Sequence, residues 1–199
     1  MPSALTSLRA ECKPLAMAVA FEPARNHRYL SALLLLALEC DKAILLPKEA
    51  MLRLIRLQWW IDALDSGATH NVPLMQDLHG LIDAGDIDKD SLIALVEHWQ
   101  KAAEHPERLP DGWAALFVLI SGQSTSFSRL LGHNLCAVLQ ERPDQIAKTD
   151  DDKSAYNAGV YPAFMRASGL LVRRGALHQL QADGRLGLWL FWQMLLGRA

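Results

Sequence analysis

Four residues in one short segment, Arg56, Gln58, Trp59 and Trp60, combine a cation, an amide and two aromatic rings. On a helix, Arg56, Trp59 and Trp60 share one side, and the two successive tryptophans point about 100° apart. Gln58 and Asp62 are four positions apart and can form a side-chain hydrogen bond. This pattern predicts either the wall of a binding pocket, in which the guanidinium fork of Arg56 meets an anion, or a core helix with polar residues at its borders.

The run IRLQWWIDALDSG at residues 55–67, which contains these residues, resembles the signature helix of the squalene/phytoene synthase family. The run HRYLSALLLLALECDKAIL at residues 27–45 is similar to that family's first core helix and lies a short distance upstream, as in the family. The resemblance is clearest over residues 20–140, and the C-terminal run GRLGLWLFWQMLLGRA is compatible with the family's last helix. It implies an all-α, isoprenoid-synthase-like helical bundle.

Active members of this family condense two prenyl diphosphates head to head. The resemblance implies two Asp-x-x-x-Asp motifs that hold magnesium, because a departing diphosphate needs a metal with hard oxygen ligands to neutralise its charge. Asp41 stands at the first position of the first motif, but Leu45 stands at the second, and Lys42 adds a cation beside Asp41. A second motif of this kind is missing from the late part of the sequence.

These departures predict a non-catalytic squalene/phytoene synthase-like protein that acts in binding or assembly and needs no cofactor. The family's respiratory complex I assembly factor branch is similar in this respect. Active members are usually longer than 199 residues, so we expect a truncated bundle whose exposed apolar groove needs a protein partner or a second copy of the chain. One alternative is an active prenyltransferase that binds Mg²⁺ through Asp41, Asp62 and Asp65, and another is an isoprenoid- or lipid-binding protein.

Apolar residues follow the helical period through most of the chain, and strand-like alternation is nearly absent. We therefore expect one all-α domain over residues 1–199. The segment Trp113–Leu139 should break at Gly122 or Gly132, because glycine weakens helix interiors. The expected helices are Thr6–Phe21, Arg25–Leu46, Lys48–Ser66, Val72–Ala84, Ser91–Glu104, Trp113–Leu139, Ser154–Arg174 and Arg185–Leu196.

Other patterns that could carry chemistry favour structural roles. Asp86 and Asp90 have the Asp-x-x-x-Asp spacing, but their segment is typical of a turn and helix cap, with Asp90 and Ser91 as the expected N-cap. Cys136 follows His133 by three positions, which could activate a thiol, although a buried apolar cysteine is the alternative. Three isolated cysteines predict no disulfide framework and a reducing compartment.

The formal net charge of −2 argues against a nucleic-acid-binding protein. The apolar stretches are interrupted by charges before they reach the roughly 20 residues that span a bilayer. The C-terminal segment Arg185–Leu196 is strongly apolar and flanked by arginines, so it either closes the bundle or lies on an anionic membrane surface or in a partner's groove. We expect a cytoplasmic protein with peripheral contact at the inner membrane through this segment.

Overall fold

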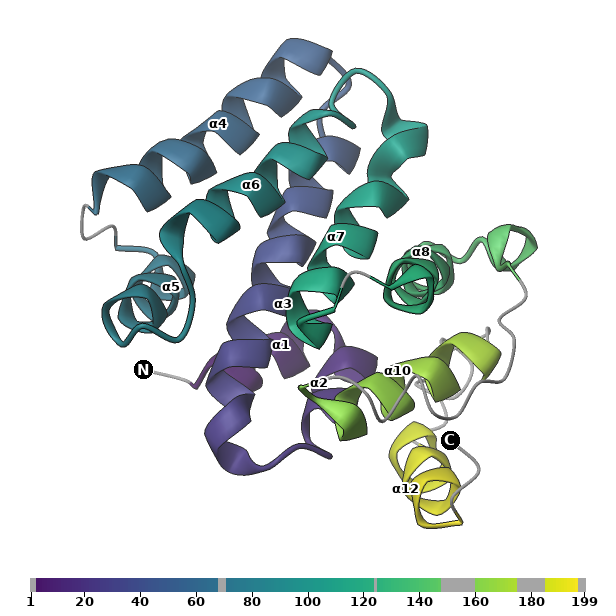
Figure 1. The fold of residues 1–199 in the computed structure, drawn as a ribbon. Coiled ribbons are helices and arrows are strands. Elements are labelled where there is room, and N and C mark those ends of the chain that lie inside the picture. The colour runs from purple at the N-terminus through teal and green to yellow at the C-terminus, as the bar shows by residue number, and fades with distance from the viewer. Residues whose placement is uncertain (1–2, 68–70, 124, 148–159, 175–184, 197–199) are drawn as a thin grey trace.

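The fold is all-α, as the sequence predicts. A computed structural model describes residues 3–67, 71–123, 125–147, 160–174 and 185–196. These residues form ten α-helices and two short 3-10 helices, and no strand is found among them (Figure 1). The helices are α1 (Ala4–Glu11), α2 (Lys13–Val19), α3 (Ala24–Leu45), α4 (Ala50–Ser66), α5 (Pro73–Asp83), α6 (Lys89–Gln100), α7 (Leu109–Ser121), α8 (Ser126–Leu139), α10 (Pro162–Arg174) and α12 (Leu186–Leu195), with η1 (Pro106–Arg108) and η2 (Pro143–Gln145).

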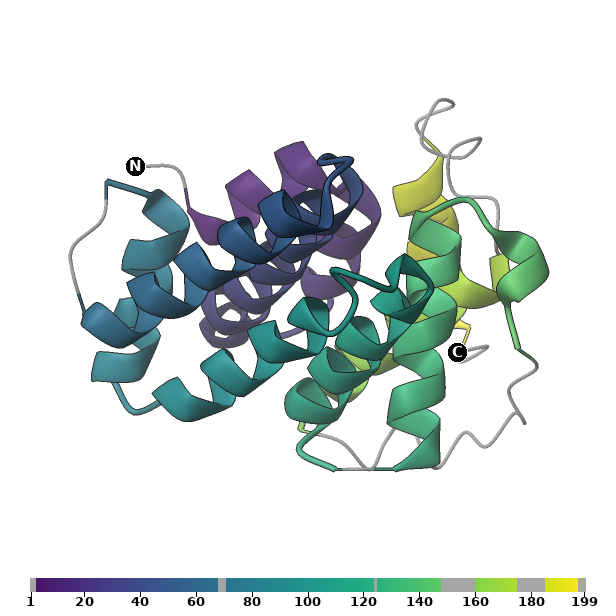
Figure 2. The same cartoon turned by 90° about the horizontal axis from the view of Figure 1, so that it is seen from above.

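Helix α3 lies at the centre of the bundle and contacts α1, α2, α4, α5, α6 and α7. It carries apolar residues on all sides, and Leu30, Leu33, Leu34, Leu36 and Ala37 are completely buried. A helix that is apolar all round is stable only when other elements cover it. Around this axis, α4 and α5 lie toward one end of the molecule and α8, α10 and α12 toward the other (Figures 1 and 2).

The expectation of one helix over Thr6–Phe21 is wrong, because the chain breaks at Cys12. The backbone of Cys12 is extended, with φ −146° and ψ 91°, and it separates α1 from α2. Pro14 lies in the first turn of α2, where its missing N–H leaves no intrahelical hydrogen bond unmade.

The predicted break in Trp113–Leu139 occurs at Gly122, which has a left-handed backbone with φ 66° and ends α7. Gly132 instead lies inside α8. A Cβ at this position would lie 2.4 Å from the backbone oxygen of Trp113, so the glycine allows α7 and α8 to pack closely. The expected helix Ser154–Arg174 is observed from Pro162 onward, and residues 154–159 lie outside the described part of the chain.

Glu22 links the C-terminal helices to the N-terminal ones. Its side chain accepts a hydrogen bond from the backbone N–H of Phe164 in the first turn of α10, at 2.9 Å, and another from Asn26 Nδ2 at 3.2 Å. The first N–H groups of a helix have no intrahelical acceptor and favour a nearby negative charge. Glu22 thus fixes α10, on which α12 packs. In the described chain, no helix combines the length and the apolar character needed to cross a bilayer.

Candidate functional site

Three of the four predicted pocket residues line one hollow between α3 and α4. Arg56, Trp59 and Trp60 project from α4, and the hollow has a volume of about 390 Å³. This volume lies near the lower end of the range for small-molecule pockets, roughly 300–1,000 Å³. The remaining lining residues come from α3, its C-terminal end and the loop before α5: Glu39, Lys42, Ala43, Leu46 and Val72.

The two adjacent tryptophans have different environments, as their separation around the helix predicts. Trp60 is 7% exposed and belongs to the core, whereas Trp59 is 41% exposed at the edge of the hollow. Their ring centroids are 5.0 Å apart with the planes at 79°, an edge-to-face contact. The pair therefore gives the hollow a rigid aromatic wall.

Gln58, the fourth predicted residue, does not line the hollow. Its Nε2 donates to Asp62 Oδ1 at 2.8 Å, which is the bond that the spacing predicts. Its Oε1 accepts from Gln100 Nε2 at 3.1 Å, and this bond joins α4 to α6. Gln58 thus acts in packing two helices together.

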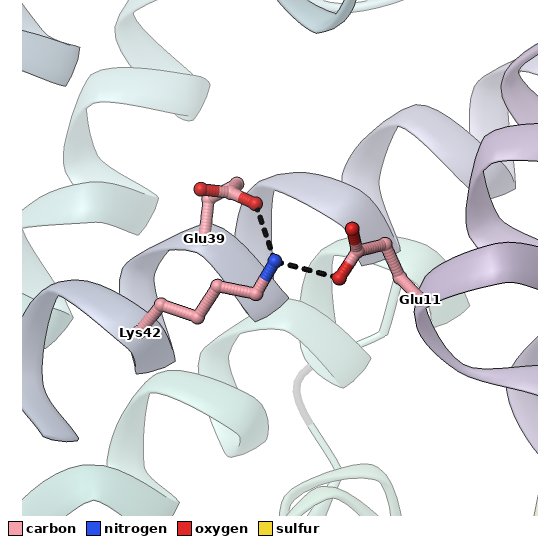
Figure 3. Close-up of polar contacts among 3 residues, drawn as sticks. All are labelled: Glu11, Glu39 and Lys42. Carbon is pink, nitrogen blue, oxygen red and sulfur yellow. Dashed lines mark hydrogen bonds and ion pairs between the residues drawn. The ribbon is translucent and has the colours of Figure 1, made fainter. Parts of the chain in front are cut away.

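The charged groups around the hollow differ in how far they are already neutralised. Lys42 Nζ lies between Glu11 at 2.6 Å and Glu39 at 2.8 Å (Figure 3). Burial alone would lower the pKa of Lys42, but the two carboxylates raise it overall. Arg53 donates to the backbone oxygens of Pro47, Lys48 and Ala103, so it holds the loop between α3 and α4 in place.

Arg56, in contrast, is exposed and makes no hydrogen bond or ion pair with any residue that the structure describes. Its guanidinium can therefore meet an anionic group at the edge of the hollow. Together, Arg56 and the tryptophan pair suit a ligand or partner segment that is mainly apolar and carries one carboxylate or phosphate.

Asp41, the residue that the resemblance places in a metal motif, is buried in the core. Trp99 Nε1 donates to its Oδ1 at 2.7 Å, and Trp113 Nε1 donates to its Oδ2 at 2.9 Å. Burial raises the pKa of Asp41 to about 6, and the two indole donors oppose that rise. Gly112 makes room for this arrangement, because a Cβ there would lie 2.6 Å from the ring of Trp99.

The three carboxylates proposed for magnesium have other partners and do not form a common cluster. Both oxygens of Asp41 are bonded to α6 and α7, Asp62 accepts from Gln58, and Asp65 pairs with Lys89 at 2.6 Å. Within the described ranges, no group of three or more His, Cys, Asp or Glu side chains could hold a metal ion. Asp41, Asp62 and Asp65 as placed in the structure therefore do not fit one shared magnesium site, since ligands of one Mg²⁺ must surround it at about 2.1 Å.

The other patterns have structural roles. Asp88, and not Asp90, caps α6 by accepting from the backbone N–H of Ser91 at 3.0 Å, because the helix begins two residues earlier than expected. Cys12, Cys40 and Cys136 are free and buried. Burial raises the pKa of the Cys12 thiol to about 11 and that of Cys136 further, so the alternative of an inert, buried Cys136 is correct.

An exposed apolar face on α4 adjoins the hollow, and the sequence analysis missed it. Met51, Ile55 and Trp59 follow one another at intervals of four and are 66%, 56% and 41% exposed. Leu52 extends this face along α4, and the exposed Leu46, at the C-terminal end of α3, lines the same hollow as Trp59. We call Leu46, Met51, Leu52, Ile55 and Trp59 the α4 apolar face. Exposed apolar patches with a polar rim mark interaction sites in many proteins.

The chain matches no protein-family model, no curated protein and no solved structure. Its function is therefore inferred from its own residues.

Proposed function

We propose that this protein is a non-catalytic helical protein that works by binding another protein through the α4 apolar face and the adjoining hollow. The observation that carries the proposal is the environment of Asp41. Its two oxygens accept hydrogen bonds from Trp99 and Trp113 inside the core, so the carboxylate serves the fold and is buried away from a metal in solvent. Leu45, at the other metal position of the motif, has no ligand atom to offer.

The chemistry of the partner follows from the residues on this surface. An apolar stripe at helical spacing, next to a rigid aromatic wall, matches an amphipathic helix that inserts one or two apolar side chains into the hollow. Arg56 favours a carboxylate on that helix near the inserted side chains. The resemblance to the complex I assembly branch makes a subunit of that respiratory complex the first partner to test.

Replacing Ile55 by Glu is expected to abolish partner binding, because it places a charge in the middle of the α4 apolar face. The measurement is affinity capture from the native host extract, with quantitative mass spectrometry of the retained proteins. Leu188→Glu is the matched control, since Leu188 is also exposed and apolar but lies on α12, at the other end of the molecule.

A protein that is retained by the wild type and by Leu188→Glu, and is lost with Ile55→Glu, would support the proposal. Equal retention by all three would contradict it. Self-association that Ile55→Glu alone abolishes would identify a second copy as the occupant. Magnesium-dependent release of diphosphate from farnesyl diphosphate would contradict the non-catalytic assignment.

A second candidate function is peripheral contact with a membrane surface through α12. Leu186 and Leu190 are buried against the bundle, whereas Leu188, Trp192 and Leu195 are exposed on the outer side at helical spacing. Such a face can enter the boundary between lipid headgroups and acyl chains.

The wild-type chain is therefore expected to sediment with vesicles that contain an anionic phospholipid. Leu188→Glu should reduce the bound fraction several-fold, because a charge opposes insertion of the apolar face. Here Ile55→Glu is the matched control and should bind as the wild type does. Equal binding by the two variants would contradict a role for α12.

A further inference from the structure

A second hollow, separate from the one beside α4, runs along the outer side of α7 between α6 and α8. Its volume is about 540 Å³, within the range of small-molecule pockets. Figure 1 shows α7 between the other two helices. We call this hollow the α6–α8 groove.

Small side chains open the groove and give it an apolar floor. Ala94 on α6 and Ala114 and Ala115 on α7 line it where larger residues would fill the space. Val118 and Leu119 continue the floor along α7. A compact apolar group can therefore lie against the floor without displacing a side chain.

The walls of the groove carry an excess of positive charge. The groove is lined by three cations: Lys101 at the C-terminal end of α6, Arg108 in η1 and Arg129 in α8. The one carboxylate among the residues that line it is Asp111. Asp111 is already engaged, since Arg108 Nε is 3.2 Å from its Oδ2 and His133 Nε2 is 3.5 Å from its Oδ1. Among the residues that line the groove, three cations thus accompany one carboxylate.

His98 also lines the groove, and its pKa depends on the charged groups around it. Its pKa is lowered first by burial and then by Lys101, with Arg129 acting in the same direction and the carboxylates Asp111 and Glu97 acting against it. Lys101, at the C-terminal end of α6, and Arg129, on α8, therefore both act on the same imidazole. An anion bound beside His98 would be attracted by both cations.

We propose that the α6–α8 groove binds a small organic anion. Its phosphate or carboxylate group would lie between Lys101 and Arg129, close to His98 and His133, and its compact apolar body would lie on the alanine floor. The chain as a whole carries a formal net charge of −2, which suits a small anionic ligand better than a nucleic acid. This site shares no residue with the α4 apolar face, so either proposal can fail alone.

The test is a titration of the full chain with phenyl phosphate, followed through the histidine ring signals in NMR spectra. The signals of His98 and His133 should shift saturably, and the pKa of His98 should rise as the anion binds. His27 and His79 serve as internal references, because their rings bond to the backbone oxygens of Glu22 and Ala63, outside the groove.

Two variants test whether the groove residues are responsible. The double variant Lys101→Gln with Arg129→Gln should weaken binding by about tenfold or more, since it removes two charge-assisted contacts. Ala94→Glu, at an exposed helical position, should do the same by placing a carboxylate at the groove. Lys13→Gln is the control, because it removes one surface charge on α2 and should leave the affinity unchanged.

The proposal is overturned if His98 and His133 do not respond at about 10 mM phenyl phosphate, a concentration that would reveal even weak binding. It is also overturned if Lys13→Gln weakens binding as much as the groove variants do. Inorganic phosphate binding as tightly as phenyl phosphate would overturn the role of the alanine floor. Vesicles that contain phosphatidylglycerol, if they perturb His98 in the wild type and not in the double variant, would support the anion site and identify a lipid headgroup as its source.

Discussion

Asp41→Ala is expected to lower the free energy of unfolding by about 3 kcal/mol or more, because two buried indole N–H groups would lose their acceptor. Trp99 and Trp113 are completely buried, so solvent cannot replace the carboxylate without opening the core. The substitution also leaves a cavity where helices α3, α6 and α7 meet. The measurement is urea unfolding at pH 7, followed by far-ultraviolet circular dichroism.

Asp62→Ala is the matched control for this experiment. Asp62 is an exposed carboxylate that accepts one hydrogen bond from Gln58 within α4. Such a pair stabilises a helix by about 0.2–0.5 kcal/mol, so its loss should change the midpoint only slightly. Equal, small effects of the two substitutions would contradict a structural role for Asp41.

The expected effect of Asp41→Ala bears on the alternative in which the protein is a prenyltransferase. That alternative predicts a variant that loses turnover and keeps its stability, whereas the position of Asp41 in the core predicts a large loss of stability. Asp65→Ala is a better probe of magnesium chemistry, because Asp65 is exposed and its ion pair with Lys89 lies on the surface.

The course of the chain could be predicted from the sequence where local signals were strong. The mainly apolar residues 30–46, which only a few polar and charged residues interrupt, predict a helix, and α3 covers most of this segment at the centre of the bundle. The break at Gly122 was predictable because glycine weakens helix interiors, and Gly122 indeed has a left-handed backbone. The break at Cys12 could not be predicted with the same ease, since it depends on how α1 and α2 separately pack against α3.

In the candidate site, too, some placements follow from local spacing and others depend on tertiary contacts. Arg56, Trp59 and Trp60 meet at one hollow because helical spacing alone puts them on one side of α4. The role of Asp41 depends on Trp99 and Trp113, which lie 58 and 72 positions further along the chain. No local pattern connects residues at such separations, so only the tertiary structure reveals that the carboxylate is bonded inside the core.

The two surfaces proposed for binding are not evident from the sequence, for different reasons. The α4 apolar face has a local signal, because the apolar residues Met51, Ile55 and Trp59 follow one another at intervals of four. Since α4 also carries apolar residues on its inner side, the sequence alone does not show which set is exposed. The α6–α8 groove has no local signal. Its cations come from three separate parts of the chain, and its apolar lining combines alanines of two helices, α6 and α7.

The contribution of Asp41 to the free energy of unfolding is expected to fall as the pH rises from about 4 to about 7. Burial raises the pKa of Asp41 from its ordinary value of 3.8 to about 6 in the folded chain. Between these two values the folded state binds more protons than the unfolded state, so each increase in pH favours unfolding. The stabilising contribution is complete below pH 3.8 and is lost as the pH rises through about 6.

The full span of this effect is about 3 kcal/mol, because one pKa unit corresponds to about 1.4 kcal/mol. It can be isolated by comparison with Asp41→Asn, which has no titratable group at this position and responds to pH through all the other groups as the wild type does. Urea unfolding of both proteins at several pH values between 4 and 7.5 should show the wild type losing stability relative to the variant as the pH rises. A difference that stays constant across this range would mean that the two indole donors keep Asp41 ionised throughout, and that the core is built around a permanent charge.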